Sequence, residues 1–178
     1  MGHKYTKTEL LEGALAVARE QGLSQLSFGR VAKHLGTSDR VIVYYFPRKE
    51  DLYVEVIQAL GQELQTRLAA AVPAAPGDHR ELCRAAWPVL AHPDADRAFG
   101  LFFEANGLAA SGVSPFDQLV PTLVTAWIDW VAALLPGTTA HRRREAELTV
   151  ALLDGLLLFR QTAGAAAANR VARSLGIL

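Results

Sequence analysis

Residues 27–46 constrain the fold more than any other part of the chain, because they combine helical spacing with strong stop signals. Their sequence is SFGRVAKHLGTSDRVIVYYF. Gly36 suits the left-handed residue that ends many helices, and Pro47 cannot continue the hydrogen-bond ladder of a helix. Two short helices joined by a tight turn at Thr37 are therefore expected, with Ser27 placed to cap the first. The apolar residues of that first helix recur on one face, at Phe28, Val31, Ala32 and Leu35.

The second of these helices has an inward and an outward face. Ser38 can cap it, and Asp39 lies near its positive end. Ile42 and either Tyr45 or Phe46 are expected to face inward. Arginine can bond guanine edges, apolar side chains can touch a thymine methyl group, and a tyrosine hydroxyl can reach a phosphate. Residues of these kinds occupy the outward positions, which are Asp39, Arg40, Val41, Val43 and Tyr44.

Basic residues are concentrated around this pair of helices. Between Ser24 and Lys49 there are five basic residues and one acidic residue, a local excess of +4 in a chain whose formal net charge is 0. A phosphate backbone needs positive charge where it is contacted. A helix-turn-helix that binds DNA is therefore favoured over the alternative, a plain helical hairpin with solvated charges.

Residues 5–60 resemble the TetR family of transcriptional regulators. The resemblance is carried by the helix-turn-helix and by the run YYFPRKEDLY at residues 44–53, where the family has aromatic residues, a turn and Lys-Glu-x-Leu. The chain departs from the family pattern at Val43, where a tyrosine is usual, and at Arg48, where a small capping residue is common. The resemblance implies a set of DNA-contacting residues, namely Ser27, Arg30, Thr37, Ser38, Asp39, Arg40, Val41, Val43, Tyr44, Tyr45 and Lys49.

An earlier helix is expected to brace this motif. Thr6 and Glu9 have the spacing of a capping box, and Gly22 is the expected end of the helix. Lys4 and Lys7 lie at its N-terminal end. They are either phosphate contacts, as the resemblance implies, or part of a flexible charged terminus.

The remaining chain is expected to be all-α, with no strand-like alternation. A helix at residues 49–70 ends in the proline- and glycine-rich residues 72–78, which form the best domain boundary. We predict a DNA-binding domain at residues 1–47, a connecting helix at 48–72, and an effector-binding and dimerisation domain at 73–178. Further helices are expected at residues 78–91 (bent or ended around Trp87-Pro88), 94–110, 116–135, 140–163 and 165–176.

Aromatic residues gather between residues 87 and 130. Such residues dominate both ordinary cores and small-molecule pockets, and composition alone favours a core. The family resemblance instead implies an effector pocket between these helices. Asp154 is either a paired core carboxylate or part of the pocket wall. The predicted ligand-binding residues are Trp87, Phe99, Phe102, Phe103, Asn106, Trp127, Trp130 and Asp154.

The helices at residues 116–135 and 140–163 carry more apolar surface than one monomer helix needs. Helices with such surfaces are buried in a large core or against another subunit. The resemblance implies that they pair across a two-fold axis as a four-helix bundle. Gly155 would permit close approach in that homodimer.

Other classes of function find little support. There is no nucleophile elbow, phosphate loop or HExxH motif, so an enzyme is disfavoured and no cofactor is expected. Cys83 is the only cysteine, which excludes an intrachain disulfide. Residues 92–96 (HPDAD) could be a metal cluster, but a helix start is favoured and no metal is predicted. The apolar stretches are interrupted by Asp129 and Asp154, so no membrane partner and a cytoplasmic location are expected.

These observations predict a TetR-like regulator, a repressor that binds a near-palindromic DNA operator as a homodimer. A small apolar or aromatic effector is expected to release it. Two alternatives are a helix-turn-helix protein without an effector and a small all-α enzyme.

Overall fold

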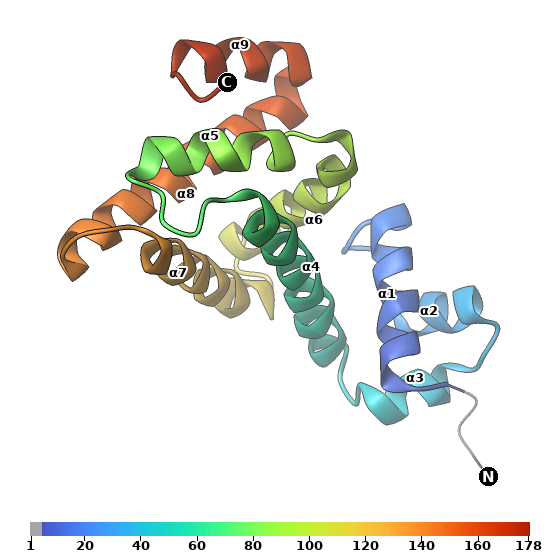
Figure 1. Cartoon of the computed structure of the whole chain (residues 1–178). Coiled ribbons are helices and arrows are strands. Elements are labelled where there is room, and N and C mark those ends of the chain that lie inside the picture. Colours follow the sequence, from blue (N-terminus) through green and yellow to red (C-terminus); the bar gives the residue numbers. More distant parts are fainter. Residues whose placement is uncertain (1–4) are drawn as a thin grey trace. The chain divides into compact units, whose positions relative to one another are not determined.

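The computed structural model describes residues 5–178, and in this part of the chain all regular structure is helical (Figure 1). The predicted all-α class is therefore confirmed. Lys4 lies outside the described residues. The helices are α1 (Lys7–Gln21), α2 (Phe28–Leu35), α3 (Asp39–Tyr45), α4 (Lys49–Ala71), α5 (His79–Leu90), α6 (Pro93–Ala110), α7 (Phe116–Leu134), α8 (Thr139–Ala163) and α9 (Ala165–Ser174).

The described residues form two compact units. The first contains the chain up to Glu63 together with Leu101–Leu119, and the second contains Leu64–Gly100 and Val120–Leu178. Helices α4, α6 and α7 each begin in one unit and end in the other. The predicted domain boundaries at residues 47 and 72 stay predictions.

Helices α1 and α2 begin and end at the signals expected from the sequence. The Thr6 hydroxyl accepts a hydrogen bond from the Glu9 backbone N–H at 3.3 Å, and the Glu9 carboxylate accepts one from the Thr6 N–H at 2.7 Å, which completes the capping box. These bonds lower the pKa of Glu9. Ser27 caps α2 by accepting the Arg30 N–H at 3.4 Å, and Gly36 ends α2 with φ of +64°.

One detail of the predicted helices is wrong. Ser38 stands at the N-cap position of α3, but its side chain makes no cap hydrogen bond. Helix α5 spans His79–Leu90, close to the predicted residues 78–91, and it ends two residues after Pro88. A proline in the last turn removes one hydrogen bond from a helix that is already ending, so it is tolerated there.

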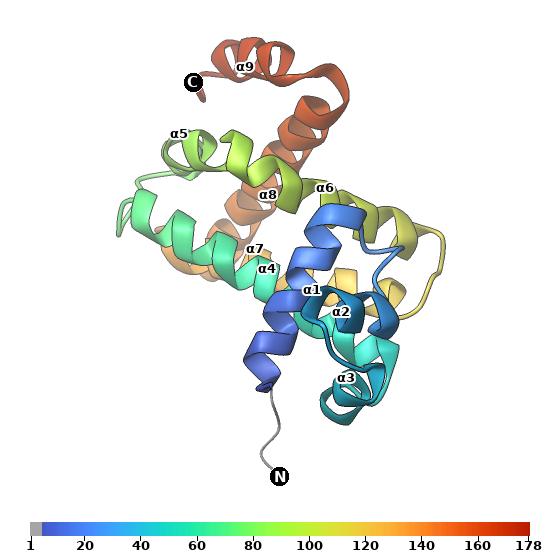
Figure 2. The ribbon, with the colours of Figure 1, turned by 90° about the vertical axis from the view of Figure 1, so that its right-hand side faces the viewer.

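The first unit packs α1, α2 and α3 against one another (Figures 1 and 2). Ile42 and Phe46 are both fully buried, as expected for the inward face of α3. The approach of α1 to α2 is close at Gly13, where a Cβ would meet the Leu35 side chain at 2.8 Å. Tyr53 of α4 is also buried, and its hydroxyl donates to the Leu26 carbonyl oxygen at 3.3 Å.

The second unit is organised around α5 and α8. One cluster of its core joins Leu82 of α5 to Val131 and Leu135 at the end of α7 and to Ala146 of α8. Helix α9 packs on α8. Among the described helices, none is both long and apolar enough to span a membrane.

Candidate DNA-binding surface and effector residues

The outward face of α3 carries four of the predicted DNA contacts. Asp39, Arg40, Val43 and Tyr44 are exposed, with Val43 and Tyr44 at 42% and 66% of their full accessible surface. Their spacing places them on one side of a helix, opposite the buried Ile42. A valine and a tyrosine with this much exposure contribute nothing to the core. The face therefore offers apolar, aromatic and cationic groups to a partner.

Val41 and Tyr45 lie at the border of this face, where both are half-buried. The Tyr45 hydroxyl donates to the Tyr5 carbonyl oxygen at 3.2 Å. The Tyr5 hydroxyl in turn donates to the carbonyl oxygen of Leu35 at the end of α2. These bonds connect the start of α1 to both helices of the motif. In this arrangement Tyr45 supports the position of α3 as well as bordering its outer face.

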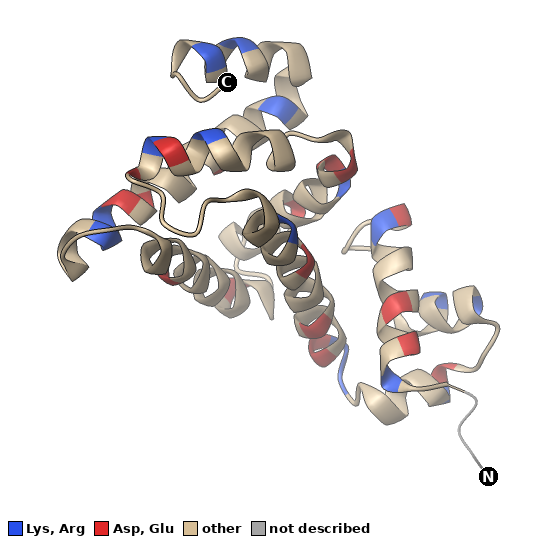
Figure 3. Ribbon diagram, viewed as in Figure 1, with Lys and Arg blue, Asp and Glu red and all other residues tan. Residues whose placement is uncertain are grey.

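Some basic residues near the motif form hydrogen bonds or ion pairs with neighbouring side chains, and others form none. Arg30 donates to the Gln21 side chain at 2.5 Å, and Arg48 pairs with Asp51 at 2.6 Å. Among the described residues, neither Lys33 nor Arg40 has a hydrogen bond or an ion pair, and both are exposed. These two cations are the ones most free to meet phosphates or bases. Figure 3 shows the basic residues on α2 and, by contrast, none on α7.

Other basic groups are held by neighbours of the motif. Lys7 pairs with Glu55 of α4 at 2.5 Å, and it lies 5.6 Å from the centre of the Phe46 ring. Lys49 lies 5.1 Å from the centre of the Tyr53 ring. Such a cation–aromatic contact at an exposed position holds a side chain weakly, so the Lys49 ammonium group can still reach a phosphate, whereas that of Lys7 is held by Glu55.

The remaining predicted contacts surround the turn between the two helices. Ser38 is exposed and Thr37 is half-buried. The Thr37 backbone N–H donates to the Ala32 carbonyl oxygen at 2.9 Å, which closes the end of α2. Ser27 is half-buried and occupied in capping α2. The structure therefore brings the predicted DNA contacts together around α2 and α3.

The predicted effector residues are not all in one compact unit. Phe102, Phe103 and Asn106 lie in the first unit, and the other five lie in the second. Trp127 and Trp130 are half-buried and meet edge to face, with ring centres 5.5 Å apart. Phe102 and Phe103 are also half-buried, with ring centres 5.5 Å apart. Half-buried pairs of this kind are compatible with ligand contact.

Trp87 and Phe99 are core residues of the second unit, at 1% and 5% exposure. The indole N–H of Trp87 donates to the Asn169 side-chain oxygen at 3.2 Å, so its polar group has a partner within the protein. Asn106 donates to the Phe102 carbonyl oxygen at 2.8 Å. The polar groups of Trp87 and Asn106 are therefore already bonded within the protein, which reduces their capacity to bond a ligand.

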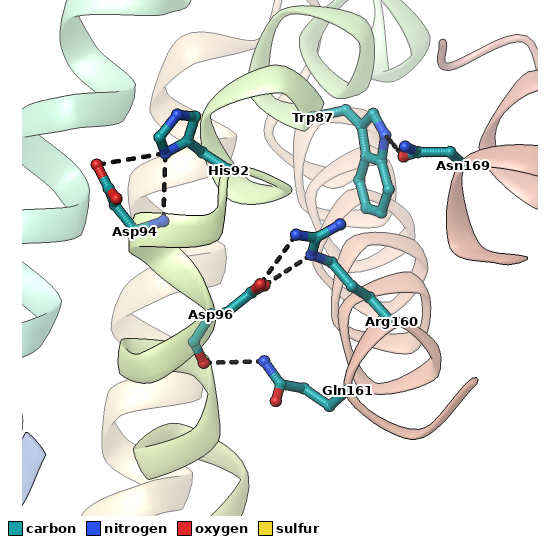
Figure 4. A network of polar contacts seen from close by, with 7 residues as sticks. All are labelled: Trp87, His92, Asp94, Asp96, Arg160, Gln161 and Asn169. Carbon is teal, nitrogen blue, oxygen red and sulfur yellow. Dashed lines mark hydrogen bonds and ion pairs between the residues drawn. The ribbon is translucent and has the colours of Figure 1, made fainter. Parts of the chain in front are cut away.

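Residues 92–96 form a helix start in the structure. The ring nitrogen Nδ1 of His92 accepts the Asp94 backbone N–H at 3.2 Å, while Asp96 turns to Arg160 (Figure 4). The three side chains thus do not converge. Among the described residues, no group of three or more metal-binding side chains is present.

Residues 10–56, which contain this candidate DNA-binding surface, match the family model of the bacterial regulatory proteins of the tetR family. This segment therefore has the sequence features of the TetR-family N-terminal domain. The resemblance drawn from the helix-turn-helix and the run after it is therefore confirmed. No protein of curated sequence and function is significantly similar to the chain.

Solved structures support the TetR-family fold over nearly the whole chain. A transcriptional regulator from Rhodococcus sp. Rha1 is 26% identical, with a TM-score of 0.70, and the match covers 90% of this chain and 86% of that one. A TetR transcriptional regulator from Legionella pneumophila is 19% identical, with a TM-score of 0.69 and coverage of 98% and 97%. A transcriptional regulator from Saccharomonospora viridis, solved with choline, is 20% identical, with a TM-score of 0.68 and coverage of 93% and 94%.

An open hollow of about 450 Å³ lies in the second unit. It is lined by the end of α7 and the start of α8, and none of the predicted effector residues lines it. Arg143 at this hollow pairs with Asp129 at 2.6 Å and with Glu147 at 2.8 Å. The charge of Arg143 is thus neutralised by neighbouring carboxylates.

Asp154 differs from the other predicted effector residues because it carries an ionisable group in a half-buried position. Its side chain is half-buried in the middle of α8, and it has no hydrogen bond or ion pair among the described residues. Loss of water on burial raises the pKa of Asp154 from 3.8 to about 6. The alternative of a paired core carboxylate is therefore wrong. An unpaired carboxylate in a desolvated position is typical of functional sites.

We expect Asp154→Asn to stabilise the protein at pH 7. The folded-state pKa is above the unfolded one, so stability contributed by the protonated group is lost as the pH rises from about 4 to about 6. The substitution should raise the free energy of unfolding at pH 7 by about 1–3 kcal/mol, from the linkage value per pKa unit. Urea unfolding of both proteins at pH 4, 5, 6 and 7 measures this difference. It should disappear near pH 4, and a difference that is constant with pH would contradict the assignment.

Proposed function

We propose that the protein is a transcriptional repressor that binds a near-palindromic DNA operator as a homodimer and is released by a small apolar or aromatic molecule. The observation that carries the DNA-binding part is the outward face of α3. Val43 and Tyr44 are exposed there without serving the core, and Arg40 has no partner among the described residues. The TetR-family match over residues 10–56 supports the same role. A repressor of bacterial genes acts in the cytoplasm, which is the location that this proposal implies.

Within this proposal, Arg40 reads bases and Lys49 contacts a phosphate. Arg40 extends from the outer face of a helix that can enter the major groove, where arginine bonds guanine edges. Lys49 stands at the start of α4, behind the motif, and its charge neutralises the DNA backbone without reading sequence. The two residues carry the same charge, so each is a control for the other.

Arg40→Ala should cost about 1–3 kcal/mol at the best site and relax the preference at one base pair. Lys49→Ala should weaken binding to all sequences similarly and reduce the salt slope by about one. The measurement begins with selection of a duplex from a random pool by the wild-type protein. Binding of all three proteins to the selected and a scrambled duplex follows at several salt concentrations. Equal losses of Arg40→Ala on both duplexes would remove Arg40 from the base-reading role.

The dimer proposal is supported by an exposed apolar stripe on α8. Leu148, Leu158 and Phe159 are 54%, 48% and 41% exposed, and the exposed Gly155 lies between them on the same side. Their spacing follows one face of a helix for about 17 Å, at 1.5 Å per residue. No neighbour lies within 4 Å of the position of a Cβ on Gly155, so the glycine leaves room for a second helix. Apolar stripes of this kind mark interfaces.

Leu158→Asp should convert the dimer to a folded monomer, because it places a charge on the exposed stripe. Leu156 is only 5% exposed, so Leu156→Asp places the same charge in the core and should unfold the protein. Sedimentation velocity at micromolar concentration, with circular dichroism, separates the two outcomes. A wild-type protein that sediments as a monomer would refute the homodimer. In the dimer, the two α3 helices should be about 34–36 Å apart or farther.

The effector proposal rests on the half-buried aromatic pairs and on Asp154. Trp127, Trp130 and Asp154 all lie in the second unit, and together they supply flat apolar surface and one negative charge. The similar Saccharomonospora viridis regulator was solved with choline, a cation of the kind that aromatic rings and carboxylates recognise. A ligand can shift DNA affinity only as far as its own affinity differs between two conformations.

We expect a bound effector to weaken operator binding by about 5- to 150-fold, the usual range for coupled sites. Choline and a panel of aromatic amines and aromatic acids are titrated, and binding is followed by quenching of tryptophan fluorescence. Operator affinity is then measured with each ligand that binds. Trp127→Phe should weaken ligand binding. If tight ligands leave operator affinity unchanged and this variant alters neither quantity, the tryptophans of the second unit are only core.

A further inference from the structure

The open hollow between the end of α7 and the start of α8 lies wholly within the second unit. Each helix contributes three lining residues, which are Asp129, Ala132 and Ala133 of α7 and Thr139, Arg142 and Arg143 of α8. On both helices these positions have the spacing i, i+3 and i+4, so each set lies on one side of its helix. The hollow is therefore lined by one face of each helix.

Arg142 brings a buried hydrogen-bond donor to this hollow. Its Nε atom is buried and has no hydrogen-bond partner, although the residue as a whole is half-buried. The rest of its side chain also forms no hydrogen bond or ion pair with the described residues. Buried polar groups in folded proteins are almost always hydrogen-bonded, so an unpaired guanidinium donor beside a hollow is suited to a partner from outside the chain.

The charges around the hollow favour an anion as that partner. Three consecutive arginines stand at the start of α8 (Figure 3). Arg143 is neutralised by Asp129 and Glu147, whereas the charge of Arg142 is not. The first turn of α8 contains no acidic residue, and a cation at this end of a helix opposes the helix dipole. A bound anion would meet the Arg142 donor and lessen this unfavourable charge arrangement.

The loop before α8 fixes the first turn of the helix. The Thr138 hydroxyl accepts the His141 backbone N–H at 3.3 Å, and the Thr138 carbonyl oxygen accepts the Arg142 N–H at 2.9 Å. Gly137 has φ of +103°, and a Cβ there would lie 2.9 Å from the His141 ring. The neighbouring Thr139 is exposed, and its hydroxyl has no partner within the described chain. The hydroxyl of Thr139 is therefore a second available donor on a fixed turn.

We propose that this hollow binds the carboxylate of a small organic acid. A guanidinium group bonds a carboxylate through two parallel N–H donors, which Arg142 supplies, and the Thr139 hydroxyl donates a further bond. Ala132 and Ala133 give the α7 side of the hollow an apolar surface for a short hydrocarbon chain. The volume of about 450 Å³ is within the usual range of small-molecule sites. The site is separate from the predicted effector residues and does not depend on the proposed function.

The test is a titration of the free full-length protein with sodium butyrate, followed by ¹H–¹⁵N NMR. The signals are the Nε–H group of Arg142 and the backbone amide of Thr139. Sodium chloride at equal ionic strength is the control for charge screening. Arg144→Gln is the matched control for Arg142→Gln, because Arg144 is an exposed arginine of the same stretch that does not line the hollow. Circular dichroism establishes that each variant is folded.

We expect butyrate to shift both signals along a saturable curve in the wild type and in Arg144→Gln. Arg142→Gln should weaken binding by about ten-fold or more, the usual effect of losing a hydrogen bond between charged groups. Arg142→Lys should also weaken it, because lysine keeps the charge but lacks the two parallel donors. Acetate should bind about three-fold or more weakly than butyrate, because it lacks two methylene groups that the alanine surface covers.

Asp129→Asn should have the opposite effect, because Asp129 is the only carboxylate among the residues that line the hollow. Its removal should strengthen butyrate binding by about two- to five-fold, the effect of removing one nearby like charge in water. This measurement leaves Arg142 intact, so it still tests the site if the Arg142 variants do not fold. Unchanged or weaker binding by Asp129→Asn would contradict the proposed site.

Two further outcomes would overturn the inference. A response to butyrate that does not saturate, or equal weakening by Arg142→Gln and Arg144→Gln, would show that only the general charge of the surface is involved. Inorganic phosphate is titrated in parallel. Phosphate that binds more tightly than butyrate would overturn the assignment to an organic acid.

Discussion

The burial of Ile42 and Phe46 is the constraint on which the candidate DNA-binding surface depends. Helix α3 has only seven residues, so these two apolar contacts at its middle and its end set its rotation about its own axis. With 3.6 residues per turn, positions 39, 40, 43 and 44 must then point away from the core. The candidate DNA-binding surface is thus a consequence of how α3 packs on α2. A substitution at either buried residue would move every proposed base contact at once.

Local chemistry explains why so much of the fold could be predicted from the sequence. Capping residues and helix-ending glycines interact with backbone groups only a few residues away, so their effects can be predicted from the local sequence. Helix ends were predicted in this way from Thr6, Ser27 and Gly36, and the structure confirms them. A serine at an N-cap position is able to accept a backbone hydrogen bond, but the residue type does not ensure that the bond forms. The Ser38 side chain does not form it. Helix α5 ends two residues after Pro88, near the end that the sequence predicted.

The rest of the candidate site depends on contacts between residues far apart in the chain, which spacing cannot reveal. The bond from Tyr45 to Tyr5 spans 40 positions and the bond from Glu104 to Leu23 spans 81. The residue type of Glu104 and its neighbours in the sequence do not reveal the two backbone N–H groups that its carboxylate binds. The aromatic residues were grouped by their proximity in sequence, whereas Phe102 and Phe103 belong to a different compact unit from Trp127 and Trp130. Only tertiary structure could separate these cases.

Helix α8 shows why composition alone could not divide core from interface. One side of it is core, where Leu157 and Arg160 are buried, and the opposite side is the exposed stripe that includes Leu148 and Leu158. Asp154 lies on the border between them, because it is about 100° around the helix from Gly155 at 3.6 residues per turn. A partner that covered the stripe would remove more water from this carboxylate and favour its neutral form further. In the proposed dimer, folding, dimerisation and the charge of Asp154 would thus be linked through a single helix, although different residues carry each of them.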